Sequence, residues 1–162
     1  MCDRTQESSK NLLRIAGEPV VVPTYTYLAE LPHVDDNGPS AHTNVLVAES
    51  RVDQGRLRAA VDAVFTANAA LGTVFEPFVD KWATRPGGGW AWAVEPPGAA
   101  VEDVVARQRA SFDMRIGRLF SASLLPGTPE RLVLTASQLC MDNSSWRGVV
   151  EDLAAAYPGL SA

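Results

Sequence analysis

The chain has 162 residues, of which 46% are hydrophobic and 20% charged, a composition that fits one globular domain. The net charge is −5 and the 14 basic residues are scattered singly, so neither nucleic acid nor an anionic membrane is an expected partner. No apolar run near the polar first residues is long enough for a signal peptide or a spanning helix, which favours a cytoplasmic protein.

The first quarter of the chain predicts little regular structure. Residues 1–18 are interpreted as a flexible leader and residues 19–162 as one folded lobe. Residues 19–27 read as an extended segment between prolines, a loop follows, and residues 43–49 are predicted to form a strand. His33 and His42 lie in or beside that loop without metal-ligand spacing, so structural or solvated roles are expected and no metal or cofactor site is predicted.

Residues 53–71 show the clearest helical pattern in the chain. Asp53 is a suitable N-cap, and the apolar positions fall on one face: Leu57, Ala60, Val61, Val64, Phe65 and Leu71. Residues 81–95 then predict a hairpin around the glycines after Pro86, with Trp90 and Trp92 on one face. This aromatic pair could bind a ligand, but a packed sheet face is the favoured interpretation.

The second half of the chain predicts a helix, a hairpin and a last helix. Residues 101–111 have helical spacing, and a turn at residues 126–129 separates two strands, the second over residues 132–137. Turn and cap residues at 142–145 lead into a helix over residues 144–157. The predicted fold is an α+β two-layer sandwich, a mostly antiparallel or mixed sheet with all three helices on one face.

Three blocks resemble the condensation and epimerisation domains of nonribosomal peptide synthetases, in the chloramphenicol-acetyltransferase-like superfamily. The family strand ends in His-His-x-x-x-Asp-Gly and often continues Ser-Trp-Arg, where this chain has Asp142 in place and Ser145-Trp146-Arg147 after it. Residues 52–75 resemble the family's first long helix and following strand. The block at 111–124 matches the family at Phe112, Asp113, Gly117, Leu119, Ala122 and Leu124.

The resemblance implies an active site whose catalytic groups are not intact here. Ser137 and Gln138 replace both histidines, and Asn143 replaces the glycine. A glutamine cannot take the proton that the second histidine is thought to handle, and a serine without a base is a poor nucleophile. Gly72 replaces an arginine believed to pair with the motif aspartate, so Asp142 is expected to serve the turn or cap instead.

Other groups near the motif offer weaker alternatives. Cys140 is expected to be a small buried residue rather than a nucleophile, and Ser145 a helix cap. His42 could lie close to the motif on a neighbouring strand, and Trp146 is expected to anchor the last helix to the sheet. Heterocyclisation domains use Asp-x-x-x-x-Asp-x-x-Ser, of which Asp142 and Ser145 match only the second half because Ser137 replaces the first aspartate.

The resemblance also implies a single lobe, since family members have two similar lobes with the active-site channel between them. The surface that meets the second lobe is then expected to be covered by a second copy or by a synthetase subunit or carrier protein. The leading interpretation is a catalytically degenerate lobe that acts as an interaction or structural module in nonribosomal peptide biosynthesis. The alternative is a condensation-type acyltransferase that a partner lobe completes.

Overall fold

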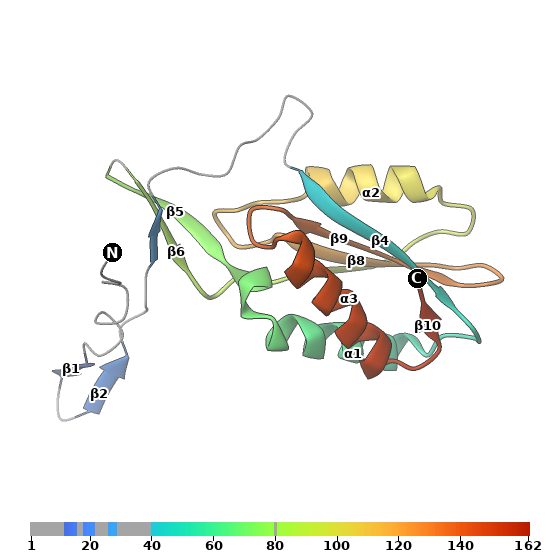
Figure 1. Ribbon diagram of the computed structural model, residues 1–162, viewed down its shortest axis with the longest axis horizontal. Coiled ribbons are helices and arrows are strands. Elements are labelled where there is room, and N and C mark those ends of the chain that lie inside the picture. The colour runs from blue at the N-terminus through green and yellow to red at the C-terminus, as the bar shows by residue number, and fades with distance from the viewer. Residues whose placement is uncertain (1–11, 16–17, 22–25, 29–39, 80) are drawn as a thin grey trace.

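The computed structural model describes residues 12–15, 18–21, 26–28, 40–79 and 81–162. Its centre is a five-stranded sheet in the order β10-β4-β9-β8-β7 (Figure 1). The strands are β4 (Ala41–Ala48), β7 (Ala91–Val94), β8 (Phe120–Leu125), β9 (Arg131–Ser137) and β10 (Leu160–Ser161). Neighbouring strands are antiparallel except β7, which pairs parallel with β8. The predicted α+β class with a mixed sheet is confirmed.

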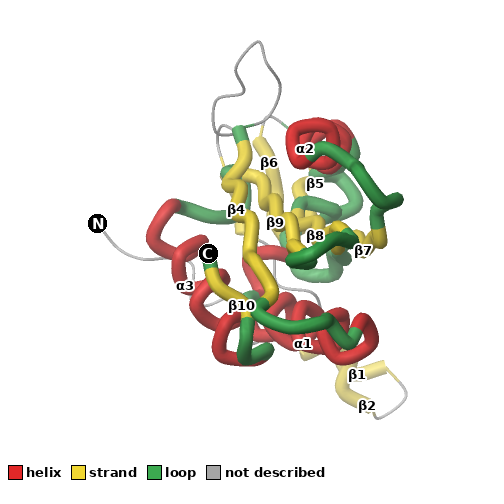
Figure 2. The backbone as a smooth tube through the Cα atoms, turned by 90° about the vertical axis from the view of Figure 1, so that its right-hand side faces the viewer, coloured by secondary structure: helices red, strands yellow, loops and turns green. Residues whose placement is uncertain are grey.

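One face of the sheet is covered by the helices α1 (Gln54–Ala67) and α3 (Asn143–Ala156). Alternate residues of β9, Leu132, Leu134 and Ala136, point to this face and have no exposed surface. Leu57 and Val61 of α1 pack against them in one continuous apolar cluster. Figure 2 shows the two helices on the same side of the strands.

The opposite face is covered by α2 (Val101–Ala110), whose Val104 packs with Leu125 and Val133 (Figure 2). The prediction that all three helices lie on one face is therefore wrong for α2. The reason lies in β8 and β9, which are buried on both faces apart from Arg131 at one end. A strand buried on both faces can be covered by a helix on either side, so its pattern does not tell which helix covers which face.

The predicted hairpin over residues 81–95 is also wrong. Lys81–Arg85 forms β6, which pairs with β5 (Val74–Phe78) and β3 (Thr26–Leu28) in a separate three-stranded sheet, while β7 joins the main sheet. The glycines between them pass through a tight crossing rather than a hairpin turn. A Cβ on Gly88 would lie 2.3 Å from the Gly117 carbonyl oxygen, so the chain can cross there only without a side chain.

The observed bounds of the other predicted helices and strands agree closely with those expected from the sequence. Asp53 caps α1 by accepting from the Arg56 N–H at 3.1 Å, and a short 3-10 helix, Ala69–Gly72, follows the α-helix. The β8–β9 hairpin feeding α3 is confirmed.

Two short strands, β1 (Leu12–Ile15) and β2 (Glu18–Val21), pair with each other within and beside the expected leader. The rest of that leader lies outside the described residues, as do Cys2, His33 and the loop around it.

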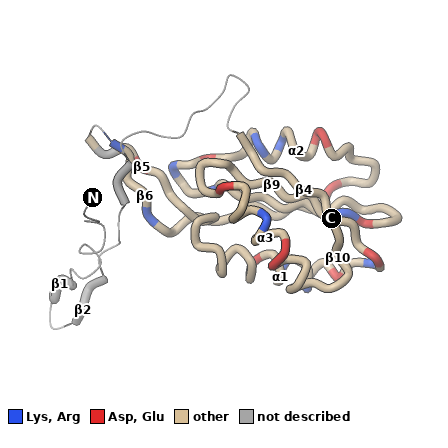
Figure 3. Tube along the Cα trace, in the orientation of Figure 1, with Lys and Arg blue, Asp and Glu red and all other residues tan. Residues whose placement is uncertain are grey.

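Basic and acidic side chains are interspersed along the described chain rather than gathered by sign (Figure 3). Among the helices of the described part, none has the length and apolar content needed to cross a membrane.

Candidate functional site

The candidate site is the signature loop, residues 137–143, which joins the end of β9 to the start of α3. Two backbone bonds fix its entry: the Ser137 N–H donates to the Leu119 carbonyl, and the Gln138 N–H donates to the Ser40 carbonyl, both at 2.9 Å. The start of the loop is therefore held between the residue before β8 and the residue before β4.

Ser137, which is expected from the sequence to replace the first motif histidine, is completely buried. Its Oγ accepts the Leu139 N–H at 3.2 Å, and its carbonyl accepts from the Cys140 backbone N–H at 3.3 Å. These contacts close a tight turn after the strand. The hydroxyl is thus used locally, and the group bonded to it, the Leu139 N–H, is not a base that could activate it.

Gln138, which is expected from the sequence to replace the second motif histidine, is exposed. Its amide side chain has no protonation equilibrium near neutral pH, so it cannot exchange a proton with a bound amine. Asn143, also exposed, is the first residue of α3. Neither residue can act as a general base.

Asp142 is the N-cap of α3, and its Oδ1 accepts the Ser145 N–H at 2.7 Å. This bond holds the pKa of the exposed Asp142 carboxyl below its usual value, with a further contribution from the ring of His42. The predicted cap role of Asp142 is confirmed. The expectation that Ser145 is the cap is wrong, because the Ser145 N–H is the donor that the capping side chain of Asp142 accepts from.

Gly72, which is expected from the sequence to replace an arginine, is buried and closes the 3-10 helix. Its carbonyl accepts the Gly88 N–H at 2.8 Å, and a Cβ there would lie 3.1 Å from the ring of Phe65. A long cationic side chain has no room at this position without moving Phe65. Asp142 accordingly keeps a backbone partner instead of an arginine.

Cys140 is the loop's only thiol and is partly buried. Burial raises the pKa of the Cys140 thiol to about 12, and the Sγ–H donates to the Ser137 carbonyl at 3.3 Å. A nucleophilic cysteine needs the thiolate near neutral pH. Cys140 therefore fits a structural role.

His42 of β4 lies against the signature loop, as expected for a neighbouring strand. Its Nε2 is 2.8 Å from the Met141 carbonyl oxygen, and its ring stacks on Trp146 with centroids 5.7 Å apart. Since a carbonyl can only accept, Nε2 carries the proton of this bond. The His42 side chain is 8% exposed, which limits its access to a bound substrate.

Trp146 anchors the first turn of α3, as predicted. Its ring lies edge-on to Phe120, and its Nε1–H donates to Asn44 Oδ1 at 2.7 Å. His42, Trp146 and Asn44 thus tie the helix to β4 beside the loop. The site's aromatic contacts hold the loop in place.

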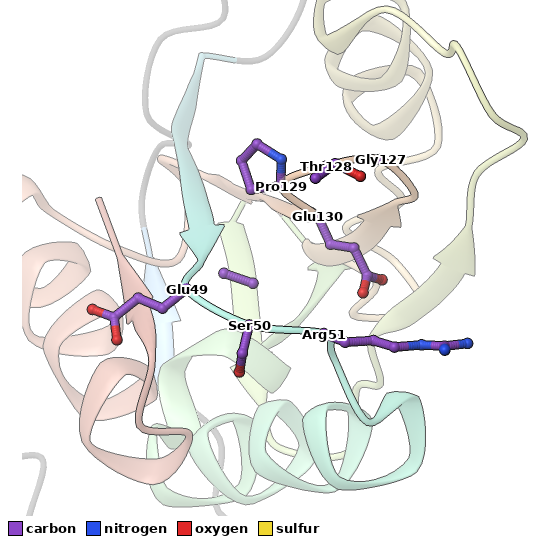
Figure 4. A pocket seen from close by; sticks show the side chains of 8 residues that line it. Glu49, Ser50, Arg51, Gly127, Thr128, Pro129 and Glu130 are labelled. Carbon is purple, nitrogen blue, oxygen red and sulfur yellow. The ribbon is translucent and has the colours of Figure 1, made fainter.

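The pockets lie elsewhere. One of about 530 Å³ sits at the opposite end of β9, around the turn before it (Figure 4). Glu130 in its wall accepts the Val52 N–H at 2.9 Å, and Glu49 and Arg51 point away from each other. It holds no convergent catalytic set. Within the residues that the structure describes, no group of three metal-ligating side chains forms either.

The sequence reasoning missed a buried polar network beneath α2. Gln108 Nε2 donates to Ser123 Oγ at 2.9 Å, and its Oε1 accepts from Thr135 Oγ1 at 3.2 Å. Ser121 is buried beside it. The signal was available, because the small polar residues alternate with the apolar ones along both strands.

Comparison with known proteins gives a consistent fold. No family model matches the chain, and no curated protein is significantly similar in sequence. Among solved structures, the epimerization domain from the third module of tyrocidine synthetase B matches with a TM-score of 0.64 at 20% identity, over 72% of this chain and 28% of its own. The starter condensation domain of rhizomide synthetase matches with a TM-score of 0.57 at 18% identity, over 72% of this chain and 32% of its own.

A third similar structure comes from a polyketide synthase. The condensation domain from the Monacolin K polyketide synthase matches with a TM-score of 0.58 at 16% identity, over 74% of this chain and 30% of its own. The chain thus spans about a third or less of the length of these domains. At these identities the likeness concerns the fold, and that fold is the one expected from the sequence: this chain folds as a single lobe of a condensation or epimerisation domain.

Proposed function

We propose that this chain is a degenerate condensation-domain-like lobe that serves as an interaction or structural module in nonribosomal peptide biosynthesis and forms no amide bond itself. The observation that carries the proposal is that neither Ser137 nor Gln138 has a side chain able to take up a proton. Ser137 is buried with its hydroxyl bonded to the Leu139 N–H, and Gln138 presents an amide that cannot titrate. Condensation chemistry that relied on positions 137 and 138 would lack a group that exchanges protons near neutral pH.

The rest of the loop supports the same proposal. Asp142 binds the Ser145 N–H, and the neutral Cys140 thiol is held on a backbone carbonyl. In the family the channel runs between two lobes, and this loop belongs to one of them, so the second wall would have to come from another lobe. The loop's polar groups stabilise the β9–α3 junction.

The partner that suits such a module is a carrier protein or a synthetase subunit from the same biosynthetic system. We expect the purified chain to bind the carrier protein encoded beside it in a saturable titration by calorimetry. A carrier protein of fatty-acid synthesis is the matched control and should give a weaker or no signal. The proposal would be overturned if the chain did not bind the neighbouring synthetase subunit and also failed to distinguish the two carriers, either by binding both equally or by binding neither.

One observation favours a second candidate, an acyltransferase completed by a partner lobe. His42 is the titratable side chain that touches the loop, through the Met141 carbonyl. Under this alternative, His42→Gln abolishes product formation in a mixture of the chain, a partner lobe and loaded carriers, while circular dichroism shows the fold retained. Product formation that survives His42→Gln, or no product at all, would exclude a base role for His42.

A further inference from the structure

The outer edge of the main sheet is formed by β7, which pairs with β8 and has no neighbour on its other side among the residues that the structure describes. In a parallel pair, successive residues direct their backbone groups alternately to one neighbour and the other. The Glu95 N–H donates to the Leu124 carbonyl, so Ala91 and Ala93 face β8 in the same way. The N–H and C=O of Trp92 and Val94 therefore point outward from the sheet.

This edge lacks two of the features that normally prevent pairing. Its four residues, Ala91–Val94, form a short strand but include no charge and no proline. Val94 is 44% exposed, although it is apolar. An uncharged edge whose backbone groups point outward is a template for another strand.

Grooves flank the edge on both faces of the sheet. On the α1 side, Trp90 and Trp92 line a groove of about 430 Å³ together with Arg58 and Asp62. On the α2 side, Ala91 and Ala93 line a smaller groove of about 170 Å³. Because side chains alternate along a strand, an added strand would send successive side chains into the two grooves in turn.

We propose that β7 is the interface at which two copies of this chain pair, edge to edge and antiparallel, so that their main sheets become continuous. The outward groups of Trp92 and Val94 can bond reciprocally when Ala93 faces Ala93 of the second copy. This register makes Trp92 and Val94 the hydrogen-bonded pair on each side of the two-fold axis. The exposed Val94 then packs across from Trp92 of the second copy, an aromatic and β-branched pair that stabilises sheets.

The charges beside the edge favour a second copy over an unrelated strand. Arg58 and Asp62 lie one helical turn apart on the α1 face that lines the Trp92 groove. A two-fold axis reverses their order in the second copy, so the cation of one copy faces toward the anion of the other. Gly55 and Ala59, on the same helix face, allow the two helices to approach.

The register can be tested by cross-linking. In a chain carrying Cys2→Ser and Cys140→Ala, Ala93→Cys places two thiols at a non-hydrogen-bonded pair on the two-fold axis, where side chains approach most closely. We expect rapid disulfide-linked dimer under mild oxidation. Val94→Cys is the matched control on the same strand and should cross-link far more slowly, because it faces position 92 of the second copy. Equal cross-linking of the two variants would overturn the proposed register.

Sedimentation equilibrium tests the association itself. The unmodified chain should show a concentration-dependent dimer, and Val94→Lys, which adds a charge at an exposed position, should lose it while its circular dichroism spectrum shows the fold retained. A chain that stays monomeric, or a dimer indifferent to Val94→Lys, would overturn the proposal. Neither readout involves a carrier protein, so a failure here leaves the proposed function standing, and the reverse also holds.

Discussion

The two faces of the main sheet are built on different principles, although the same strands supply both. Toward α1 and α3, β8 and β9 present large apolar side chains such as Phe120 and Leu134. Toward α2 they present Leu125 and Val133 together with small polar side chains. Among the polar ones are Ser123 and Thr135, which are bonded to Gln108, and Ser137 at the signature loop. The apolar face depends on volume, whereas the polar face depends on particular hydrogen bonds. Ser137 therefore belongs to a face where the size and polarity of each side chain are tightly constrained.

The largest effect is expected on the apolar face. Leu134→Ala removes a fully buried side chain between the sheet and the two helices, and should lower the free energy of unfolding by about 2–5 kcal/mol. Urea denaturation with an unchanged m-value would measure it. A loss comparable to that of a surface substitution would mean that this face is not the main core.

A smaller effect is expected where the polar face meets the loop. Ser137→His places a larger ring at a position with no exposed surface and removes the Oγ acceptor of the Leu139 N–H, so we expect a loss of about 1–3 kcal/mol. Gln138→His is its matched control, because position 138 is exposed and should change stability by no more than about 0.5 kcal/mol. Equal stability of the two variants in chemical denaturation would contradict the structural role of Ser137.

Ser121 and Ser123 should respond in opposite ways. The Ser121 Oγ is buried and has no hydrogen-bond partner among the described residues, whereas Ser123 Oγ accepts from Gln108. Ser121→Ala should leave the melting temperature unchanged or raise it, while Ser123→Ala should lower stability by about 1 kcal/mol. Calorimetry on both variants would compare them, and a larger loss for Ser121→Ala would contradict the hydrogen-bond assignment on this face.

The smallest effect is expected at the exposed cap of α3. The lowered pKa of Asp142 means that its contribution to stability is present above the unfolded-state pKa and is lost as the pH falls through the folded-state pKa. Asp142→Asn keeps an acceptor for the Ser145 N–H, so it should remove this part of the acid destabilisation below about pH 4. Thermal melts across the acid range would show it. An unaltered pH dependence in the variant would place the acid sensitivity elsewhere.

The sequence predicts the positions of the helices along the chain better than it predicts which face of the sheet each one covers. Helical spacing located α1, α2 and α3, and the turn residues after β9 identified the loop and its Asp142 cap. The side of the sheet that α2 covers was not predictable from periodicity, because β8 and β9 are buried on both faces. The crossing at Gly88 looked like a hairpin turn, since glycine is favoured both in turns and at close backbone contacts.

At the candidate site, the residue types that limit chemistry could be read from the sequence, but their contacts could not. Gln138 is unable to titrate in any fold, whereas the bond from the Leu139 N–H to Ser137 depends on the turn that β9 makes. The stacking of His42 on Trp146 joins residues about a hundred positions apart and needed the pairing of β4 with β9. Long-range contacts of this kind are set by sheet register rather than by local pattern.

The central claim is that the signature loop maintains the fold and performs no condensation. Intact-protein mass spectrometry of an acceptor-loaded carrier, incubated with a donor-loaded carrier in the presence and absence of the chain, tests it most directly. We expect the same amount of condensed product with and without the chain, including when the neighbouring synthetase subunit that lacks its own condensation activity is added. Product that appears only with the chain, and disappears with His42→Gln, would contradict the account.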